Sequence, residues 1–284
     1  MMRVARIRDD VHETYGLVQD GRVATAEDIS RRTGVPLPLS IKSFLFEGWA
    51  DEISADEISF RSDISDFEIL APIPTPPKIV CLAFNYGDHA AEQDVLSPPD
   101  PVIVIKPRTA LAGAHSAIRH PAFVKKLDYE IELALVIGRN CKNVPADEAM
   151  GCVAGYMILN DVTARDIQFK DGQFGRSKGM DTFAPCGPWI TTADEIADPH
   201  NLRLVTRING VVRQDSTTAN MSIRIPGIIS GLSRAMTLER GDIISTGTPA
   251  GVAHNSDWDY LKGGDTVEMQ IQGLGSISNT VEMI

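Results

Sequence analysis

Two glutamates in the segment LDYEIELALVIG are spaced so that their side chains could act together. In an extended strand Glu130 and Glu132 point to the same face, with their α-carbons about 6.6 Å apart. At an effective dielectric of about 20, two unit charges at this distance repel each other by roughly 2.5 kcal/mol. Either solvent or a bound cation would offset that repulsion. The same face continues with Ala134 and Val136, so it turns apolar beyond the carboxylates, which favours the cation.

Asp161 is a candidate for a third ligand. It directly follows the apolar segment VAGYMILN, and an acid at the end of a buried strand lies where site residues are common, although it could equally begin a turn. Three carboxylates with no histidine or cysteine beside them suit a hard ion such as Mg²⁺, Mn²⁺ or Ca²⁺ better than Zn²⁺. The residue types therefore predict a divalent-metal site.

Polar residues that follow Asp161 form a second pattern. Thr163 and Asp166 have the spacing of a capping box, which predicts that a short helix begins here. Arg165 and Gln168 would then lie one turn apart on a shared face of that helix.

His89 and Glu92 form a third pattern, because residues three apart share one face of a helix. The carboxylate could orient the imidazole and raise its basicity, as a general acid–base pair requires. Taken alone, such a pair is more often a solvated surface ion pair. The residues themselves leave both alternatives open.

The elements that must position these side chains are mostly strands. Short segments rich in branched residues and bounded by Gly, Asn or Asp predict them: VIVI, EIELALVIG, VAGYMILN, LRLVTRI, DIIST and TVEMQI. Asn209-Gly210, between LVTRI and VVRQ, predicts a hairpin. Helical signals are few: ADEAM after Pro145, the turn after Asp161, and IPGIISGLSRAMT near residues 225–237. We expect a mainly β domain with minor helices, of the α+β class.

The first seventy residues are expected to form a small module of their own. Asp20-Gly21 predicts a hairpin, Thr25 and Asp28 predict the start of a helix that ends at Gly34, and a second helix is expected over residues 40–48. The proline-rich segment APIPTPPK then predicts a stiff linker. The expected domains are an N-terminal module over residues 1–71 and a catalytic domain over residues 72–284.

Bulk composition narrows the class of protein. With a net charge of −11 and no basic cluster, the chain is a poor partner for nucleic acid. Its apolar runs are shorter than the roughly 18 residues that span a bilayer, and no signal peptide is evident, so we expect no membrane partner and a cytoplasmic location. The four cysteines lack metal-site or CxxC spacing and are expected to be reduced and structural.

Five segments resemble successive blocks of the fumarylacetoacetate hydrolase family, in the family's order. They are PPKIVCLAFNYGDHAAEQ, LDYEIELALVIG, VAGYMILNDVTARDIQ, SKGMDTFAPCGPWI and GDIISTGTPAGV, and they extend from about residue 73 toward the C-terminus. The resemblance implies a mixed β-sandwich roll, usually a homodimer, with a Mg²⁺-like ion held by Glu130, Glu132 and Asp161. It also implies that His89 and Glu92, of the NYxxHxxE block, form an acid–base pair on a mobile lid.

The resemblance also assigns roles around this centre. Lys178 matches the family's catalytic-site lysine. Substrate contacts are expected from Tyr86, Arg165, Gln168, Gly247 and Thr248, with Thr248 at the substrate's carboxylate end. Gly247 and Gly251 would let backbone N–H groups approach an anion closely. Two departures, Thr163 for the more usual Ser and Ala83 for a frequent Gly, do not touch the expected chemistry.

Three functions are compatible with this set of residues. Metal-dependent hydrolysis of a C–C bond in a small 2,4-dioxo acid, similar to acylpyruvate or fumarylpyruvate, comes first. An oxaloacetate-type decarboxylase, or a 2-oxo acid isomerase or lyase on the same site, comes second, because the fold and metal ligands do not select the reaction. A catalytically silent metal-binding dimer comes third, and the presence of His89, Glu92 and Lys178 argues against it.

Overall fold

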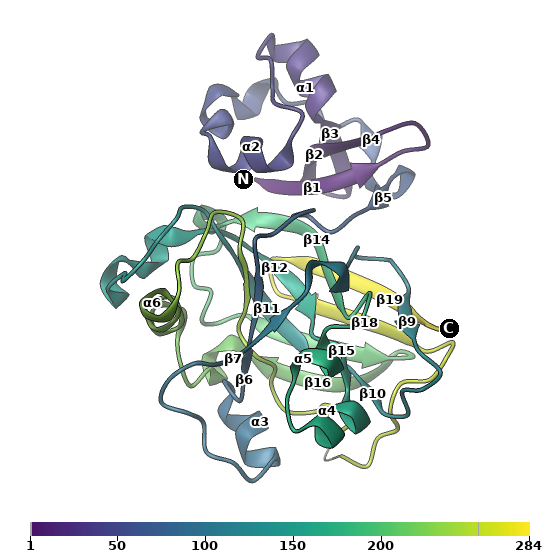
Figure 1. Ribbon diagram of the computed structural model, residues 1–284. Helices are drawn as coiled ribbons and strands as arrows, with labels where there is room; N and C mark the ends of the chain where they lie inside the picture. Colours follow the sequence, from purple (N-terminus) through teal and green to yellow (C-terminus); the bar gives the residue numbers. More distant parts are fainter. Residues whose placement is uncertain (1, 255) are drawn as a thin grey trace.

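The computed structural model describes residues 2–254 and 256–284, which form a mainly β protein with few helices. Figure 1 shows the N-terminal residues as a small lobe at one end, with α3 and α4 at the opposite end of the molecule. Among the described residues no helix has the length and apolar character needed to span a membrane.

A twelve-stranded sheet runs through both the lobe and the main body. Its spatial order is β4 (Ser62–Asp63), β3 (Arg22–Thr25), β2 (Glu13–Gln19), β1 (Arg3–Arg8), β14 (Ala184–Thr192), β12 (Val153–Asn160), β11 (Ile131–Ile137), β17 (Ile243–Ser245), β6 (Ile79–Ala83) and β7 (Val102–Lys106). Two short strands join this path, β5 (Glu68–Ile69) beside β1 and β8 (Leu111–Ala112) beside β14.

Two smaller sheets complete the main body. One has five strands in the order β16 (Val211–Thr217), β15 (Arg203–Ile208), β18 (Thr266–Ile271), β19 (Gly275–Met283) and β9 (Ile118–His120). The other pairs β10 (Leu127–Asp128) with β13 (Thr163–Ala164). The predicted hairpin at Asn209-Gly210 is confirmed, since β15 and β16 pair on either side of it and both turn residues have positive φ.

The α-helices are short and lie outside the sheets. They are α1 (Ala26–Thr33), α2 (Ile41–Phe46), α3 (Gly87–Glu92), α4 (Arg165–Asp171), α5 (Gly175–Lys178) and α6 (Ile225–Ala235). The 3-10 helices are η1 (Trp49–Glu52), η2 (Ala55–Glu57), η3 (Ile64–Asp66), η4 (Arg108–Ala110), η5 (Ala146–Cys152), η6 (Ala193–Glu195) and η7 (Thr218–Asn220).

Strand β11 divides the core into two layers. Leu133 and Leu135 belong to the apolar cluster that lies between β11 and the five-stranded sheet. Ala134 and Val136 belong to a second cluster on the opposite face, together with residues of β6, β12 and β14. Because side chains alternate along a strand, Glu130 and Glu132 belong to this second face.

The N-terminal module has the local elements that its sequence predicts. The hairpin at Asp20-Gly21 joins β2 to β3, Thr25 caps α1, and Gly34 ends that helix in the left-handed conformation. Its strand β1 also pairs with β14 of the main body, at Val4 opposite Ile190. The module is therefore hydrogen-bonded into the large sheet.

The proline-rich segment after the module packs closely against the body. Ile73 is fully buried and belongs to the same apolar cluster as Ala134. The guanidinium of Arg6 donates to the carbonyl of Ala71 at 3.1 Å. The predicted domain boundary at residues 71–72 thus lies in a chain segment that contacts both parts.

Candidate active site

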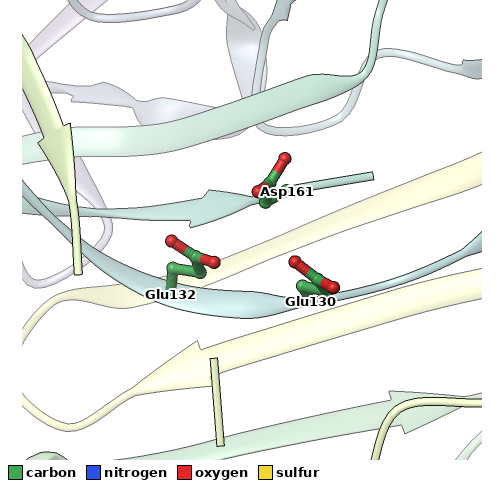
Figure 2. A group of neighbouring side chains, drawn as sticks. All are labelled: Glu130, Glu132 and Asp161. Carbon is green, nitrogen blue, oxygen red and sulfur yellow. The ribbon is translucent and has the colours of Figure 1, made fainter. Parts of the chain in front are cut away.

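Three carboxylates meet at one end of the large sheet (Figure 2). Glu130 directly precedes β11, Glu132 is the second residue of that strand, and Asp161 directly follows β12. The antiparallel register places Glu132 opposite Leu159, and the Asp161 N–H donates to the Glu130 carbonyl at 2.9 Å. One oxygen from each carboxylate lies within 4.8 Å of the others, and all three residues are buried. The predicted ligands therefore converge on one point.

Two lysines contact this cluster. Nζ of Lys178 donates to Glu130 Oε2 at 2.7 Å, to Asp161 Oδ2 at 2.6 Å and to Thr163 Oγ1 at 2.8 Å. Lys106, at the end of β7, forms an ion pair with the other oxygen of Asp161. Burial would lower the pKa of Lys178, but the charges of Asp161 and Glu130 outweigh it and raise the pKa above its ordinary value. Lys178 is therefore a cation here and not a base.

Glu132 is the carboxylate with the fewest positive neighbours. Its Oε2 accepts from the Ser245 hydroxyl and from the Gly247 N–H at 3.0 Å, whereas its Oε1 is buried and has no hydrogen-bond partner among the described residues. Burial raises the pKa of Glu132 well above its ordinary value, and the charges of Asp161 and Glu130 raise it further. By contrast, burial raises the pKa of Glu130 less than the charges of Lys178 and Arg165 lower it.

These observations fit a divalent-metal site. Among the described residues, the buried cluster contains four carboxyl groups, with Asp128 the fourth, and three cations, Lys106, Arg165 and Lys178, so that one negative charge is uncompensated once Glu132 is ionised. A buried carboxylate oxygen without a partner is costly. An ion at the three convergent oxygens would satisfy that oxygen and supply the missing charge.

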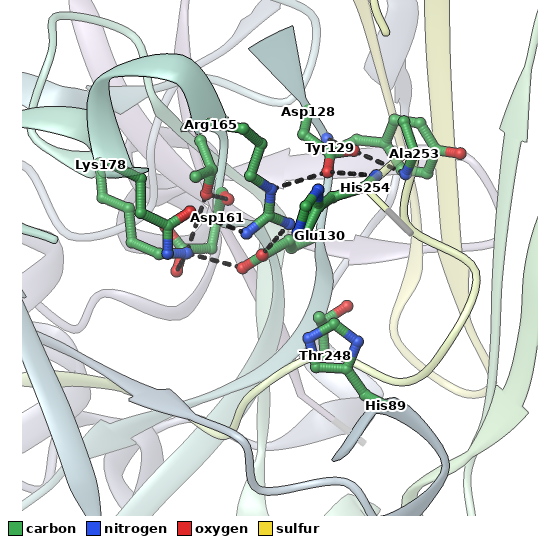
Figure 3. Close-up of polar contacts among 12 residues, drawn as sticks. His89, Asp128, Tyr129, Glu130, Asp161, Arg165, Lys178, Thr248, Ala253 and His254 are labelled. Atoms are coloured by element: carbon green, nitrogen blue, oxygen red, sulfur yellow. Dashed lines mark hydrogen bonds and ion pairs between the residues drawn. The ribbon is translucent and has the colours of Figure 1, made fainter. Parts of the chain in front are cut away.

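Arg165 extends the cluster toward Asp128 of β10 (Figure 3). Its Nε donates to Asp128 at 2.8 Å and its Nη2 to Glu130 at 2.5 Å. Its Nη1 donates to the side chain of Gln168 at 3.2 Å, so both predicted substrate contacts on α4 lie together.

The helix is thus confirmed, but the predicted capping box is wrong. Helix α4 begins after Ala164 with no side-chain cap. Thr163 instead contacts Lys178 and its hydroxyl donates to the Asp161 carbonyl, while Asp166 accepts from the backbone N–H groups of Lys125 and Lys126. Thr163 is therefore engaged in the polar site and Asp166 in the preceding loop, and neither side chain caps α4.

His89 lies on α3 and its ring points toward the cluster in Figure 3. Its Nδ1 lies 3.3 Å from Glu92 Oε2, and its Nε2 lies 2.6 Å from the amide nitrogen of Gln93. Because an amide nitrogen only donates, Nε2 accepts and the ring proton is on Nδ1, facing Glu92. That is the tautomer in which Nε2 can act as a base.

A small cavity joins the two groups. Its volume is about 30 Å³, and its lining includes His89, Gln93, Glu130, Glu132, Arg165, Gln168, Lys178 and Thr248. The hydroxyl of Thr248 donates to the Ile131 carbonyl, and the side chain is almost completely buried. These residues form one site around the carboxylates.

Of the other predicted contacts, Tyr86 lies outside the cavity, and Gly247 and Gly251 have partners within the protein. Tyr86 is fully buried in the core and is absent from the cavity lining. The N–H of Gly247 donates to Glu132, and that of Gly251 donates to Glu92 at 3.3 Å. The two glycines therefore approach anions as predicted, but these anions are carboxylates of the chain itself.

Three functional candidates escape sequence reasoning. Lys106 ends the apolar run VIVIK, and a charged residue that closes an apolar run was the available signal. Gln93 follows the NYxxHxxE block by one residue, and no spacing rule selects it. Asp128 shares a face with Glu130, but only the fold shows that it contacts Arg165.

Comparison with known proteins gives the family. The family model described as the C-terminal domain of fumarylacetoacetate hydrolase matches residues 78–282. The chain belongs to the fumarylacetoacetate hydrolase family. It has the family's fold: the solved structure of a fumarylacetoacetate hydrolase from Exiguobacterium antarcticum has a TM-score of 0.88 and 34% identity, with all of both chains covered.

Other relatives differ in their reactions. The mitochondrial oxaloacetate tautomerase Fahd2a of Rattus norvegicus is 41% identical over 219 residues, which cover 76% of this chain and 70% of that protein. The structure of a 2-hydroxyhepta-2,4-diene-1,7-dioate isomerase from Mycobacterium marinum has a TM-score of 0.77 and 36% identity, covering 100% of this chain and 99% of that one. This chain is accordingly an enzyme of the family, whose members include hydrolases and isomerases.

Proposed function

We propose that this enzyme uses a divalent ion, with Mg²⁺ the first candidate, to isomerise a small 2-oxo acid between its keto and enol forms. Oxaloacetate is the substrate that we test first. The observation that carries the proposal is the placement of His89 above the carboxylate cluster, in a cavity that also contains Arg165, Gln168 and Lys178. A base and several fixed cations around one small space suit formation of an enolate.

Glu130, Glu132 and Asp161 would hold the ion. When bound, a divalent ion would supply Lewis-acid polarisation of the substrate's carbonyl oxygen. Its two positive charges would leave the buried cluster with one positive charge in excess, which an anionic substrate would neutralise. This charge balance supports a carboxylate ligand.

Each side chain then has a stated task. Nε2 of His89 would remove the proton from the carbon beside the carbonyl, and Glu92 would stabilise the resulting imidazolium through Nδ1–H. Lys178 would stabilise negative charge on the oxygen, and Arg165 with Gln168 would bind the carboxylate. Return of the proton to the oxygen gives the enol, so one base and no water suffice.

Gln93 must release Nε2 before His89 can act, because its amide occupies that nitrogen at 2.6 Å. A bound substrate that accepts the amide hydrogen bond would free the lone pair.

Hydrolysis of a 2,4-dioxo acid, which the sequence places first, is the second candidate. The pairing of His89 with Glu92 favours it, since the same base could activate a water for attack on the distal carbonyl. Such a reaction needs a site that holds both water and the acyl group.

A substrate panel separates the candidates. Mg²⁺-loaded enzyme is mixed with oxaloacetate, an acylpyruvate and fumarylpyruvate, while enol absorbance, pyruvate and carboxylic acid release are followed, with and without chelator. Chelator-sensitive enol–keto interconversion without C–C cleavage supports the proposal. Cleavage of the dioxo acids would favour the hydrolase, pyruvate from oxaloacetate a decarboxylase, and no reaction would refute enolate chemistry on these substrates.

A homodimer and a cytoplasmic location also belong to the proposal. They rest on the family resemblance and on the sequence. Light scattering after size-exclusion chromatography tests the first, and a mass near the 30.9 kDa of one chain would contradict it.

A further inference from the structure

Asp128 is a fully buried carboxylate that is saturated with hydrogen bonds. Its Oδ1 accepts from the N–H groups of Tyr129 and Ala253, both at 2.9 Å. Its Oδ2 accepts from the Arg165 guanidinium at 2.8 Å and from the His254 N–H at 3.0 Å. One side chain thus joins the site arginine to the loop at residues 251–254 (Figure 3).

The same loop contacts α3. The N–H of Gly251 lies 3.3 Å from both carboxylate oxygens of Glu92, at the C-terminal end of the helix that carries His89. The other end of α3 is held separately, because Asp88 accepts from Ser216 at 2.9 Å and from Asn220 at 3.2 Å. The position of Gly251 therefore decides whether Glu92 has a docking partner.

Gly251 has little freedom to move on its own. Its φ is +101°, and a Cβ at this position would lie 2.3 Å from the carbonyl oxygen of Arg213. Two residues further along, the N–H of Ala253 donates to the carboxylate of Asp128. A shift of Asp128 would accordingly be transmitted to the N–H that meets Glu92.

We propose that Asp128 is a positioning residue that couples the carboxylate site to the docking of α3. Arg165 forms ion pairs with both Glu130 and Asp128, so the orientation of its guanidinium depends on both carboxylates. Asp128 lies on β10, opposite Thr163 of β13, and Thr163 is also a partner of Lys178. The carboxylate site and the docked position of α3 are therefore both connected to Asp128, a side chain that would contact neither the substrate nor the ion.

Hydrogen–deuterium exchange on the Mg²⁺-loaded full chain tests this coupling. Asp128→Asn keeps the shape but removes the charge and replaces one of the two acceptor oxygens by a donor NH2 group. We expect amides at 251–254 and, at a distance, those of 87–93 to exchange at least about tenfold faster, because the N–H groups of Ala253 and His254 lose their hydrogen bonds to a charged carboxylate. Asp166→Asn is the matched control, since Asp166 also accepts two backbone N–H groups near Arg165, and it should leave 87–93 unchanged.

Faster exchange confined to 251–254, with α3 as in the wild type, would overturn the proposal and make Asp128 a purely local support. If Asp128→Asn does not fold, Asp128→Glu keeps the charge and is expected to fold with faster exchange in α3. Unchanged exchange in α3, or failure of both variants to fold, would overturn it as well.

An activity measurement rests in addition on the proposed function. In Asp128→Asn, kcat on the substrate identified by the panel should fall about tenfold or more, because closure of α3 is weakened. If wild-type enzyme turns over none of the panel, the proposed function fails, while the exchange experiment still decides the role of Asp128.

Discussion

Glu132 differs from the other two carboxylates of the centre because one of its oxygens has no hydrogen-bond partner in the described part of the chain. The glutamate spacing and the apolar continuation of the strand predict this cluster, since a period of two is enough to place side chains on one face. Lys106 could not be predicted in the same way. Its contact with Asp161 depends on the pairing of β7 with β6, which brings together segments distant in the sequence.

Proton release should accompany metal binding. Because the folded state raises the pKa of Glu132, this carboxyl holds a proton at pH values where an exposed glutamate has lost it. Without the ion, its contribution to stability is present at low pH and is lost as the pH rises through the raised pKa. Mg²⁺ affinity should therefore increase over that same range.

Calorimetric titration with Mg²⁺ in buffers of different ionisation enthalpy measures the released protons. The number per bound ion should decline as the pH is raised. A binding heat that is the same in all buffers at every pH tested would contradict the role of Glu132.

His89→Ala should lower turnover by about a hundredfold to ten-thousandfold, the usual contribution of a general base. Metal affinity should barely change, because the residue lies on α3 and not among the carboxylates. Steady-state kinetics with a parallel Mn²⁺ titration measures both. The exposed His115→Ala is the control, and wild-type turnover in metal-loaded His89→Ala would mean that another group is the base.

At the scale of secondary-structure elements, local sequence signals correctly predict the features whose geometry is set by neighbouring residues. The hairpins at Asp20-Gly21 and Asn209-Gly210 and the cap at Thr25 are confirmed because their geometry is set within a few residues. The capping box at Thr163 fails because Lys178 and Asp161 compete for its hydroxyl. No local sequence pattern predicts the parallel pairing of β17 with β6, because these two strands are far apart in the sequence.

The loop that docks α3 should tolerate no side chain at Gly251. Gly251→Ala combines positive φ with a contact of 2.3 Å to the Arg213 carbonyl, whereas Gly264→Ala has positive φ in open space. Gly264→Ala should lower the free energy of unfolding by about 1 kcal/mol or more, and Gly251→Ala by several kcal/mol. Chemical denaturation measures both values. Equal losses would show that the loop adjusts freely and that its position is not fixed.

At the scale of the whole molecule, the N-terminal module lies at the end opposite α3 and α4 in Figure 1. Composition predicts a boundary in the proline-rich segment, and the module does have an apolar cluster of its own. Composition could not predict that β1 extends the large sheet through β14, because edge pairing depends on two distant strands.

Removal of residues 1–71 should therefore lower stability without removing the metal site. The fragment loses β1, one of the strands that pair with β14, so its melting temperature should fall, while Mn²⁺ affinity should stay within about threefold because the carboxylates lie at the beginning of β11 and after β12. Thermal denaturation and calorimetry measure the two effects. An unfolded fragment would show that the module is part of the catalytic domain's core.

The central claim is that three buried carboxylates hold one divalent ion for catalysis. Calorimetric titration of chelator-treated protein with Mn²⁺ tests it most directly, with wild type beside Glu132→Gln, which keeps the shape and removes the charge. The account predicts one site per chain in the wild type and binding weakened at least about tenfold in the variant, matching the metal-affinity cost of an altered ligand environment. No binding by the wild type, or equal affinity in Glu132→Gln, would contradict it.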